Sequence, residues 1–115
     1  GAFRERVRFF EGSCRVTGVD KPELLIASHI KPWATSDNEE RLNGHNGLFL
    51  SPHVDKLFDS GFISFENTGE ILVSPSLDKN VLDRWSIDPQ SKVKTFGGEQ
   101  AYFLETHRRA VFRAA

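Results

Sequence analysis

The chain has 115 residues, enough for one domain with a modest core and too few for two. Hydrophobic residues make up 38% and charged residues 27% of the chain, which excludes a disordered protein. The formal net charge is -1, so no overall basic field indicates nucleic acid as the partner. Any contact with phosphate must therefore come from a local patch or from a metal ion. Cys14 is the only cysteine, which excludes an intrachain disulfide framework and a four-cysteine zinc site.

The sequence carries no sign of a membrane or secretory protein. No apolar run reaches the roughly 18 residues of a membrane span, and no signal-peptide pattern opens the chain. A single thiol fits a reducing compartment, so we expect a cytoplasmic protein with no membrane partner. Because the chain starts Gly-Ala and contains no methionine, we expect residues 3–113 to be one domain excised from a longer protein. Residues 1–2 are then expected to be additions from a tag.

The first third of the chain predicts a helix, an extended piece and a strand. The apolar residues of "FRERVRFF" recur at helical spacing, which predicts a helix over residues 3–10. "CRVTG" is read as a short extended piece closed by Gly18. "ELLIASHI" is apolar and β-branched, which predicts a strand near residues 24–30 that Pro32 stops.

The centre of the chain predicts a strand followed by a short helix. A polar loop with one helical turn at residues 38–42 leads into a second strand at 47–50. In "SPHVDKLFDSG", Ser51 suits an N-cap and Gly61 suits the residue just past a helix end. The apolar residues between them fall on one face, so we expect a two-turn helix near residues 52–59.

The last third of the chain predicts a hairpin and two helices. "FISFENTGEILVS" alternates around an Asn-Thr-Gly turn and is typical of a hairpin. "SLDKNVLDRW" predicts a helix that begins at Ser76, and "EQAYFLETHRRAVFRA" predicts a longer helix after a Gly-Gly break. His107 shares an apolar face of that helix, so we expect a packed histidine there. The predicted fold class is α+β: a ββα core with a β-hairpin and flanking N- and C-terminal helices.

One histidine in the centre of the chain decides how the sequence is interpreted. In "IASHIKPWA", the end of a buried strand presents Ser28, His29 and Lys31. A lone histidine on an apolar strand is ordinarily a hydrogen-bonded core residue. The interpretation of His29 therefore depends on the motifs that follow it.

The order of these motifs resembles the HNH family of endonucleases, specifically its restriction-type branch. The resemblance lies in "SHI" at a strand end, "NG" before an apolar strand, and "H-x-D-x-x-FDxG" on the helix. "CRVTG" upstream and "YFLETHRRAVF" downstream fit the flanks of such domains, so the resemblance covers residues 3–113. It implies a ββα unit in which a divalent metal lies beside a histidine that activates water. The expected function is metal-dependent hydrolysis of DNA phosphodiester bonds, as the cleavage domain of a restriction or defence protein.

The resemblance assigns roles to three residues. His29 matches the general base, and Asn46 matches the middle asparagine, which steadies the loop and the orientation of the histidine. Asp55, nine residues after Asn46, stands where the family places a metal ligand. Imidazole is the side chain best suited to accept a proton near neutral pH. Since Mg²⁺ is bound by only one or two carboxylates and keeps several waters, Mg²⁺ or Mn²⁺ is expected rather than Zn²⁺.

The identity of the second metal ligand stays open. Ser28 stands where many HNH proteins carry a metal-binding aspartate or histidine, and serine is a poor ligand. On an ideal helix Asp59 lies about 40° from Asp55, whereas His53 points about 160° away. Helical geometry therefore favours Asp59, while the resemblance gives His53 some support, and both rank below Asp55.

Each of the remaining assignments also has an explanation that involves no function. Lys31, Arg41 and Lys56 flank the site closely enough to form a phosphate-binding patch for DNA, although a solvated face explains them nearly as well. Asn46 before glycine is independently a turn former. The alternative function is a catalytically degenerate HNH-like module that binds DNA or a protein, which Ser28 and the near-neutral charge favour. The partners expected are DNA and an N-terminal recognition domain in the parent chain, with a homodimer as an alternative to a monomer.

Overall fold

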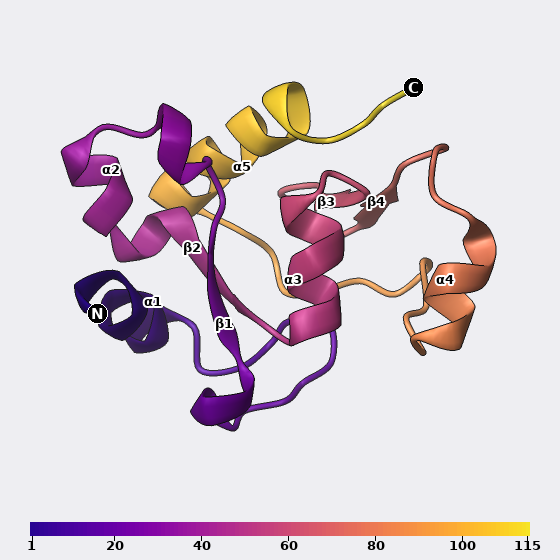
Figure 1. Ribbon diagram of the computed structural model, residues 1–115, viewed down its shortest axis with the longest axis horizontal. Coiled ribbons are helices and arrows are strands. Elements are labelled where there is room, and N and C mark those ends of the chain that lie inside the picture. Colours follow the sequence, from indigo (N-terminus) through magenta and orange to yellow (C-terminus); the bar gives the residue numbers. More distant parts are fainter.

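The computed structural model describes all residues 1–115 and contains two antiparallel two-stranded sheets with five α-helices around them (Figure 1). The strands are β1 (Ile26–His29), β2 (Gly47–Leu50), β3 (Ile63–Phe65) and β4 (Ile71–Val73). The helices are α1 (Ala2–Phe10), α2 (Asn38–Leu42), α3 (Pro52–Asp59), α4 (Lys79–Arg84) and α5 (Gly98–Ala110). Short 3₁₀ turns are η1 (Pro22–Leu24), η2 (Trp33–Thr35) and η3 (Gly44–Asn46). The predicted α+β class with a ββα core is confirmed.

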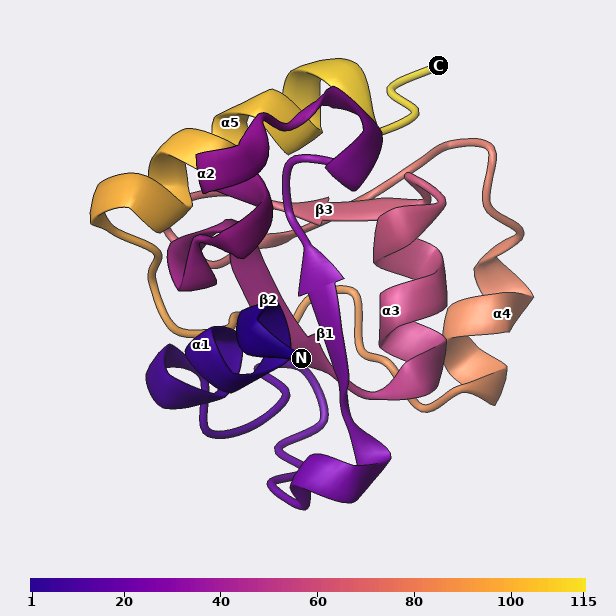
Figure 2. The same cartoon turned by 60° about the vertical axis from the view of Figure 1, so that its left-hand side comes forward.

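The β1–β2 pair forms the centre of the ββα unit. β1 pairs antiparallel with β2, so that Ser28 lies opposite Leu48 and His29 lies opposite Gly47. Figure 2 shows the two strands running between α1 on one side and α3 on the other. All four residues of β2 are buried, whereas β1 is partly exposed. The end of β1 is therefore the place where strand side chains can reach both a helix and solvent.

Helix α3 follows β2 directly and has the boundaries that the sequence predicts. Its apolar face is fully packed into the core through Val54, Leu57 and Phe58. Ser51 occupies the N-cap position, but its hydroxyl pairs with the Thr17 hydroxyl at 2.7 Å instead of capping the helix. Gly61 closes the helix end with φ of +78°, and a Cβ there would lie 2.2 Å from the Val111 carbonyl oxygen. Only glycine fits at this point.

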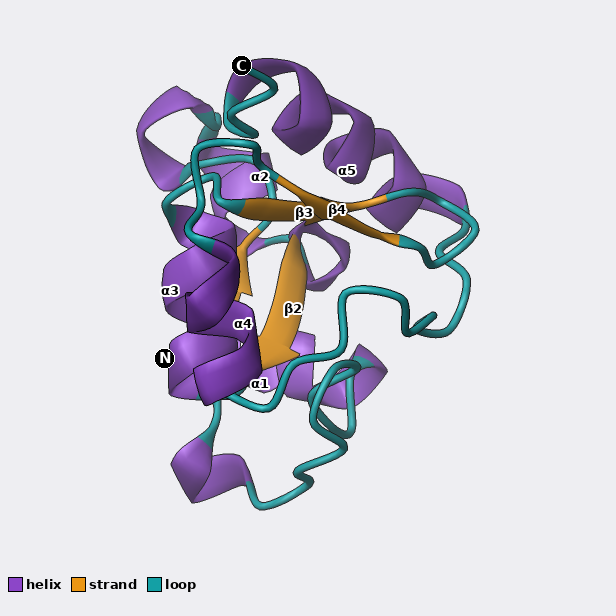
Figure 3. Cartoon of the chain, turned by 90° about the vertical axis from the view of Figure 1, so that its right-hand side faces the viewer, coloured by secondary structure: helices purple, strands orange, loops and turns teal.

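The second sheet joins the ββα unit to the C-terminal helix. Figure 3 shows the β3–β4 sheet beside α5, and β3 contacts both α5 and α3. His107 of α5 is fully buried and stacked on Phe58, with ring centroids 3.8 Å apart. Its Nε2–H donates to the Phe58 carbonyl at 2.9 Å, and the Ser64 hydroxyl donates to Nδ1 at 2.8 Å. Burial lowers the pKa of His107 to about 4, so the ring is neutral at ordinary pH. The predicted packed histidine is confirmed.

Two local predictions are wrong. "CRVTG" is a turn rather than an extended piece, because its backbone groups bond to one another: the Gly18 N–H donates to the Cys14 carbonyl at 2.8 Å. Helix α4 begins at Lys79 rather than at Ser76, because the Asp78 carboxylate accepts from the Asn80 N–H at 2.9 Å and caps the helix there. Neither difference changes the bounds of β1, β2 or α3. None of the helices is long and apolar enough to cross a membrane.

Candidate active site

A polar pair lies between the end of β1 and the first turn of α3. Asp55 is half-buried on α3, and burial raises the pKa of its carboxyl, with the nearby charge of Asp59 adding to the rise. Ser28 of β1 is 4% exposed and lies close enough to lower that pKa, but its hydroxyl makes no hydrogen bond of standard geometry. A buried hydroxyl without a partner is unusual in a folded protein. Ser28 and Asp55 therefore form a site that is short of one polar partner.

His29 points to the opposite side of β1, toward α1. Successive side chains of a strand alternate between its faces, so Ser28 faces α3 and His29 faces α1. The imidazole stacks flat on the Phe3 ring, with centroids 3.6 Å apart and planes 5° apart. Its Nε2 lies 3.0 Å from the Arg41 carbonyl oxygen. Because a carbonyl can only accept, Nε2 carries the proton and Nδ1 keeps the free lone pair that a general base requires.

Asn46 is a fully buried clamp for the polar loop. Its Oδ1 accepts from the Lys31 N–H at 2.8 Å, and its Nδ2 donates to the Glu40 carbonyl at 3.1 Å and to the Lys31 carbonyl at 3.3 Å. The next residue after Glu40 is Arg41, whose carbonyl holds His29. Asn46 thus acts on the histidine through the loop, and its burial keeps it from touching a substrate.

The three metal-ligand candidates do not converge. His53 packs edge-on against Trp85, with centroids 5.7 Å apart, and so faces α4. Asp59 is exposed and acts on Asp55 through its charge, on the side that helical geometry predicts. No three His, Cys, Asp or Glu side chains lie close enough together to hold a metal ion.

The polar pair suits one kind of ion better than another. Zinc sites take three or four protein ligands, which this chain does not bring together. Mg²⁺ takes one or two carboxylates and fills its remaining positions with water or phosphate. The carboxylate of Asp55 and the unpartnered hydroxyl of Ser28 fit such a weakly held, oxygen-bound ion.

Of the three predicted DNA-binding cations, two are already engaged within the protein. The Lys31 ammonium lies 2.9 Å from both carboxylate oxygens of Glu40, and this pairing raises the pKa of Lys31. The Arg41 guanidinium lies over the Trp33 ring at 3.7 Å and donates to the Trp33 carbonyl. Lys56, next to Asp55, is exposed and has no ion-pair partner. It is the cation of the three that is most readily available to a phosphate.

Two contacts at the site could not be predicted from the sequence. The Phe3 ring was expected only on the apolar face of a helix, and nothing in its neighbourhood indicates that it stacks on His29. The Arg41 carbonyl has no sequence signal at all, because any residue at this position presents one. The spacing of "FRERVRFF" predicts that Phe3 packs inward, but it does not predict its partner.

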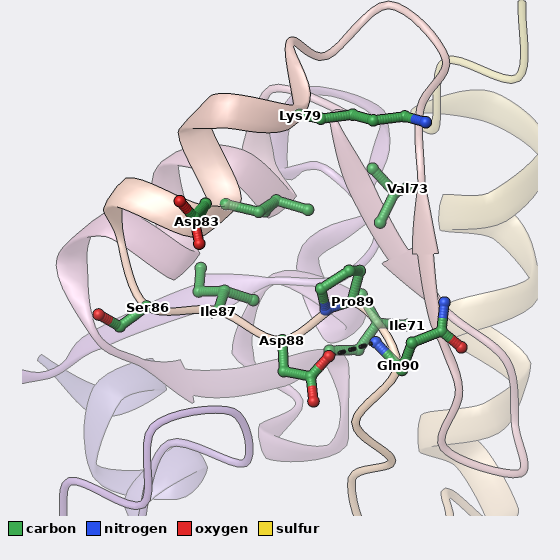
Figure 4. Close-up of a pocket in the computed structure, with 10 residues that line it drawn as sticks. Ile71, Val73, Lys79, Asp83, Ser86, Ile87, Asp88, Pro89 and Gln90 are labelled. Atoms are coloured by element: carbon green, nitrogen blue, oxygen red, sulfur yellow. Dashed lines mark hydrogen bonds between the residues drawn. The ribbon is translucent and has the colours of Figure 1, made fainter.

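One well-formed pocket of the molecule lies away from this site. It has a volume of about 740 Å³ and lies between β4 and α4, where Ile71, Val73 and Ile87 line its interior (Figure 4). Asp83 and Ser86 stand at its margin (Figure 4). None of the predicted site residues lines it.

The β1–β2 hairpin followed by α3 is a ββα unit with a histidine at the end of its first strand and an aspartate on its helix. Residues 14–66, which span this unit, match the family model described as HNH endonuclease. The match confirms the predicted HNH family over this segment and implies a nuclease or DNA-binding function. The match does not distinguish the restriction-type branch. No curated protein matches the chain.

Proposed function

We propose that this chain is a metal-dependent DNA endonuclease domain that hydrolyses phosphodiester bonds within a restriction or defence protein. The observation that carries the proposal is that one strand end of an HNH segment presents a half-buried carboxylate and an unpartnered hydroxyl on one face and an oriented histidine on the other. In this proposal a separate recognition domain of the parent chain selects the DNA, and the protein works in the cytoplasm.

Asp55 and Ser28 are the residues that would hold the metal, as Mg²⁺ or Mn²⁺. When bound, the ion supplies positive charge to the phosphate oxygens as negative charge develops on them. Asp55 provides the ionic ligand, and the Ser28 hydroxyl provides a neutral oxygen to the ion or to one of its waters. Lys56, exposed and unpaired beside Asp55, contacts the phosphate backbone of the bound strand.

His29 is the general base of the proposal. Its Nε2–H is held by the Arg41 carbonyl, so Nδ1 faces the reaction with its lone pair free and accepts the proton of the attacking water. Asn46 serves as a positioning residue because it holds the loop that carries this carbonyl. The base and the polar pair occupy the two faces of β1, so the proposal requires the phosphodiester to lie across the end of the strand.

The test is a plasmid-nicking assay combined with metal titration by calorimetry. His29→Ala should lower the nicking rate by about 10²–10⁴-fold, the contribution of a positioned general base. It should leave metal affinity unchanged, because the metal-holding groups lie on the other face of β1. Asp55→Ala should remove both metal binding and nicking. Asp83→Asn, which removes an exposed carboxylate of α4, is the matched control and should change neither. A folded His29→Ala protein with the native nicking rate would overturn the catalytic assignment.

A second function, a degenerate HNH module that binds DNA or a protein without cutting it, is favoured by one observation: Ser28 stands at the position before the histidine, where serine is a poor metal ligand. The same assay separates the two functions. A degenerate module retains labelled DNA or a protein partner but does not nick plasmid at any concentration of Mg²⁺ or Mn²⁺, and His29→Ala then changes nothing.

A further inference from the structure

Helix α1 lies outside the segment that matches the HNH family, yet it contacts the candidate base directly. We propose that Phe3 of α1 is a positioning residue for His29, so that the N-terminal helix is a working part of the active site. This inference rests on the nuclease function proposed above.

The contact fixes a degree of freedom that the hydrogen bond leaves open. The bond from His29 Nε2 to the Arg41 carbonyl fixes one corner of the imidazole but permits the ring to rock about that point. A second ring stacked at 3.6 Å and 5° fixes the plane of the imidazole. Together the two contacts determine where the free Nδ1 lone pair points. General-base catalysis depends on this direction, since the base must lie within hydrogen-bonding reach of the proton it removes.

Phe3 is itself held firmly against the β1–β2 pair. Gly47 lies opposite His29 in β2, and a Cβ at Gly47 would lie 2.3 Å from Val7 Cγ2 and 2.9 Å from Phe3 Cζ. The Phe3 ring therefore fills the space that a side chain on β2 would occupy. Val7, one turn along α1, is fully buried.

A further tie holds the first turn of α1. The Arg4 guanidinium donates to the Leu25 carbonyl at 2.8 Å and also to the Pro22 carbonyl, at the entry to β1. These contacts anchor the Phe3 ring to the strand whose histidine it covers.

A positioning role and a plain packing role predict different results for Leu and Tyr at position 3. Leucine fills much of the volume but has no flat face, whereas tyrosine keeps the flat ring. If Phe3 only fills space, Phe3→Leu should act through stability alone. If it orients His29, Phe3→Leu should lower kcat and Phe3→Tyr should restore it.

The kinetic arm uses plasmid nicking with saturating Mn²⁺. We expect Phe3→Leu to lower kcat by about 10-fold, within the up to 10²-fold that a small misplacement of a reacting group costs. KM should stay unchanged, because Phe3 packs against His29 and Gly47, away from the phosphate contact proposed for Lys56 on α3. Phe3→Tyr should keep the native kcat. Phe9→Leu is the matched control, since Phe9 lies on the same helix, is 83% exposed and does not touch His29.

The second arm observes the His29 ring directly and does not depend on nuclease activity. Nitrogen NMR of ¹⁵N-histidine-labelled protein should show His29 as the Nε2–H tautomer in the native chain, with ring protons shielded by the stacked phenyl group. In Phe3→Leu we expect both tautomers and loss of the shielding, with a native melting curve in the circular dichroism. If the native chain cuts no DNA, the nuclease proposal falls, while the tautomers still decide whether Phe3 orients His29. Native tautomer and native kcat in folded Phe3→Leu would overturn the inference, as would a kcat that falls only with the folded fraction.

Discussion

At the scale of single residues, Asp55 carries a charge where the fold makes charge costly. Its carboxyl is half-buried between α3 and β1, and the one neighbouring hydroxyl, that of Ser28, does not form a full hydrogen bond with it. A charged carboxylate in this environment costs stability. Perturbed carboxyls of this kind gather at functional sites.

Asp55→Asn should therefore raise the melting temperature of the metal-free protein. Burial raises the pKa of Asp55 in the folded state, so the folded protein favours the protonated carboxyl. The stability gained from this group is complete below the unfolded pKa, which is near 3.8, and is lost as the pH rises through the folded value. Asparagine carries no charge and escapes the loss, so its advantage over aspartate should grow as the pH rises from 4 to 7.

Calorimetric melting of both proteins in EDTA checks this expectation. Asp83→Asn, with its exposed carboxylate on α4, should match the native protein throughout. If Asp55→Asn melts at or below the native temperature at pH 7, then the burial of this carboxylate does not lower the stability of the fold.

At the scale of elements, the molecule places one helix on each side of a two-stranded hairpin. α3 and α1 lie on opposite sides of β1 (Figure 2). Ser28 lies beside Asp55 of α3, and His29 stacks on Phe3 of α1. The approach of α1 is close because Gly47 presents no side chain to it. The β1–β2 pair is thus the wall between the polar pair and the stacked histidine.

Gly47→Ala tests how much stability this close approach carries. The added Cβ would lie 2.3 Å from Val7 Cγ2, and Val7 is fully buried, so α1 has to move away from the hairpin. We expect a loss of about 1–3 kcal/mol in the free energy of unfolding, as for other overpacked sites. Urea unfolding measures it, with Gly12→Ala as control because a Cβ at Gly12 has nothing within 4 Å. Equal stability of the two variants would show that α1 docks loosely.

The elements could be predicted well from the sequence wherever local signals agree. For α3, Ser51 at the N-cap, the apolar face and Gly61 all point to the same boundaries, which the structure confirms. α4 begins later than predicted because Ser76 and Asp78 are both acceptable caps and no local rule chooses between them. The prediction for "CRVTG" is wrong because an extended segment needs a partner strand, and the backbone groups of this segment bond to no strand.

The candidate site, like the elements, could be predicted from the sequence only where local patterns report it. The motif order singles out His29 and Asp55, and the family match supports the segment that contains them. Their surroundings depend on contacts between distant parts of the chain: Phe3 against His29, Ser28 beside Asp55, Glu40 on Lys31. No local pattern reports such contacts, because each arises only when the hairpin and its two helices have packed.

At the scale of the whole molecule, one hydrophobic cluster of 19 buried residues joins both sheets to the helices. His107 lies within this packing and ties three elements together: α5 through its backbone, α3 through Phe58 and β3 through Ser64. The neutral ring satisfies both of its nitrogens inside the core. A proton added there would have to enter a buried and already bonded site.

The stability of the fold should therefore fall in acid through His107. Its pKa is lowered from 6.5 to about 4 on folding, so the unfolded chain takes up this proton first. The stabilising contribution is complete above pH 6.5 and is lost as the pH falls from 6.5 to 4, by roughly 3.5 kcal/mol at about 1.4 kcal/mol for each pH unit between the two values. His107→Gln should be less stable at pH 7 but should show a flatter decline over this range. Urea unfolding at several pH values measures the two slopes, and parallel slopes would mean that another group controls the acid response.

The alternation of Ser28 and His29 on β1 also constrains how this chain can change length. Asn46 grips both backbone groups of Lys31 just after the strand, and Arg4 holds Leu25 just before it. Between these fixed points, a deletion or insertion of one residue would turn every later side chain of the strand to the opposite face. The histidine would then face α3 and lose its stack, while the serine would face α1. The loop before η1 lies outside the grip, because Arg4 also holds Pro22 at the start of η1, so variation in length is tolerated in that loop and is excluded from the four residues of β1.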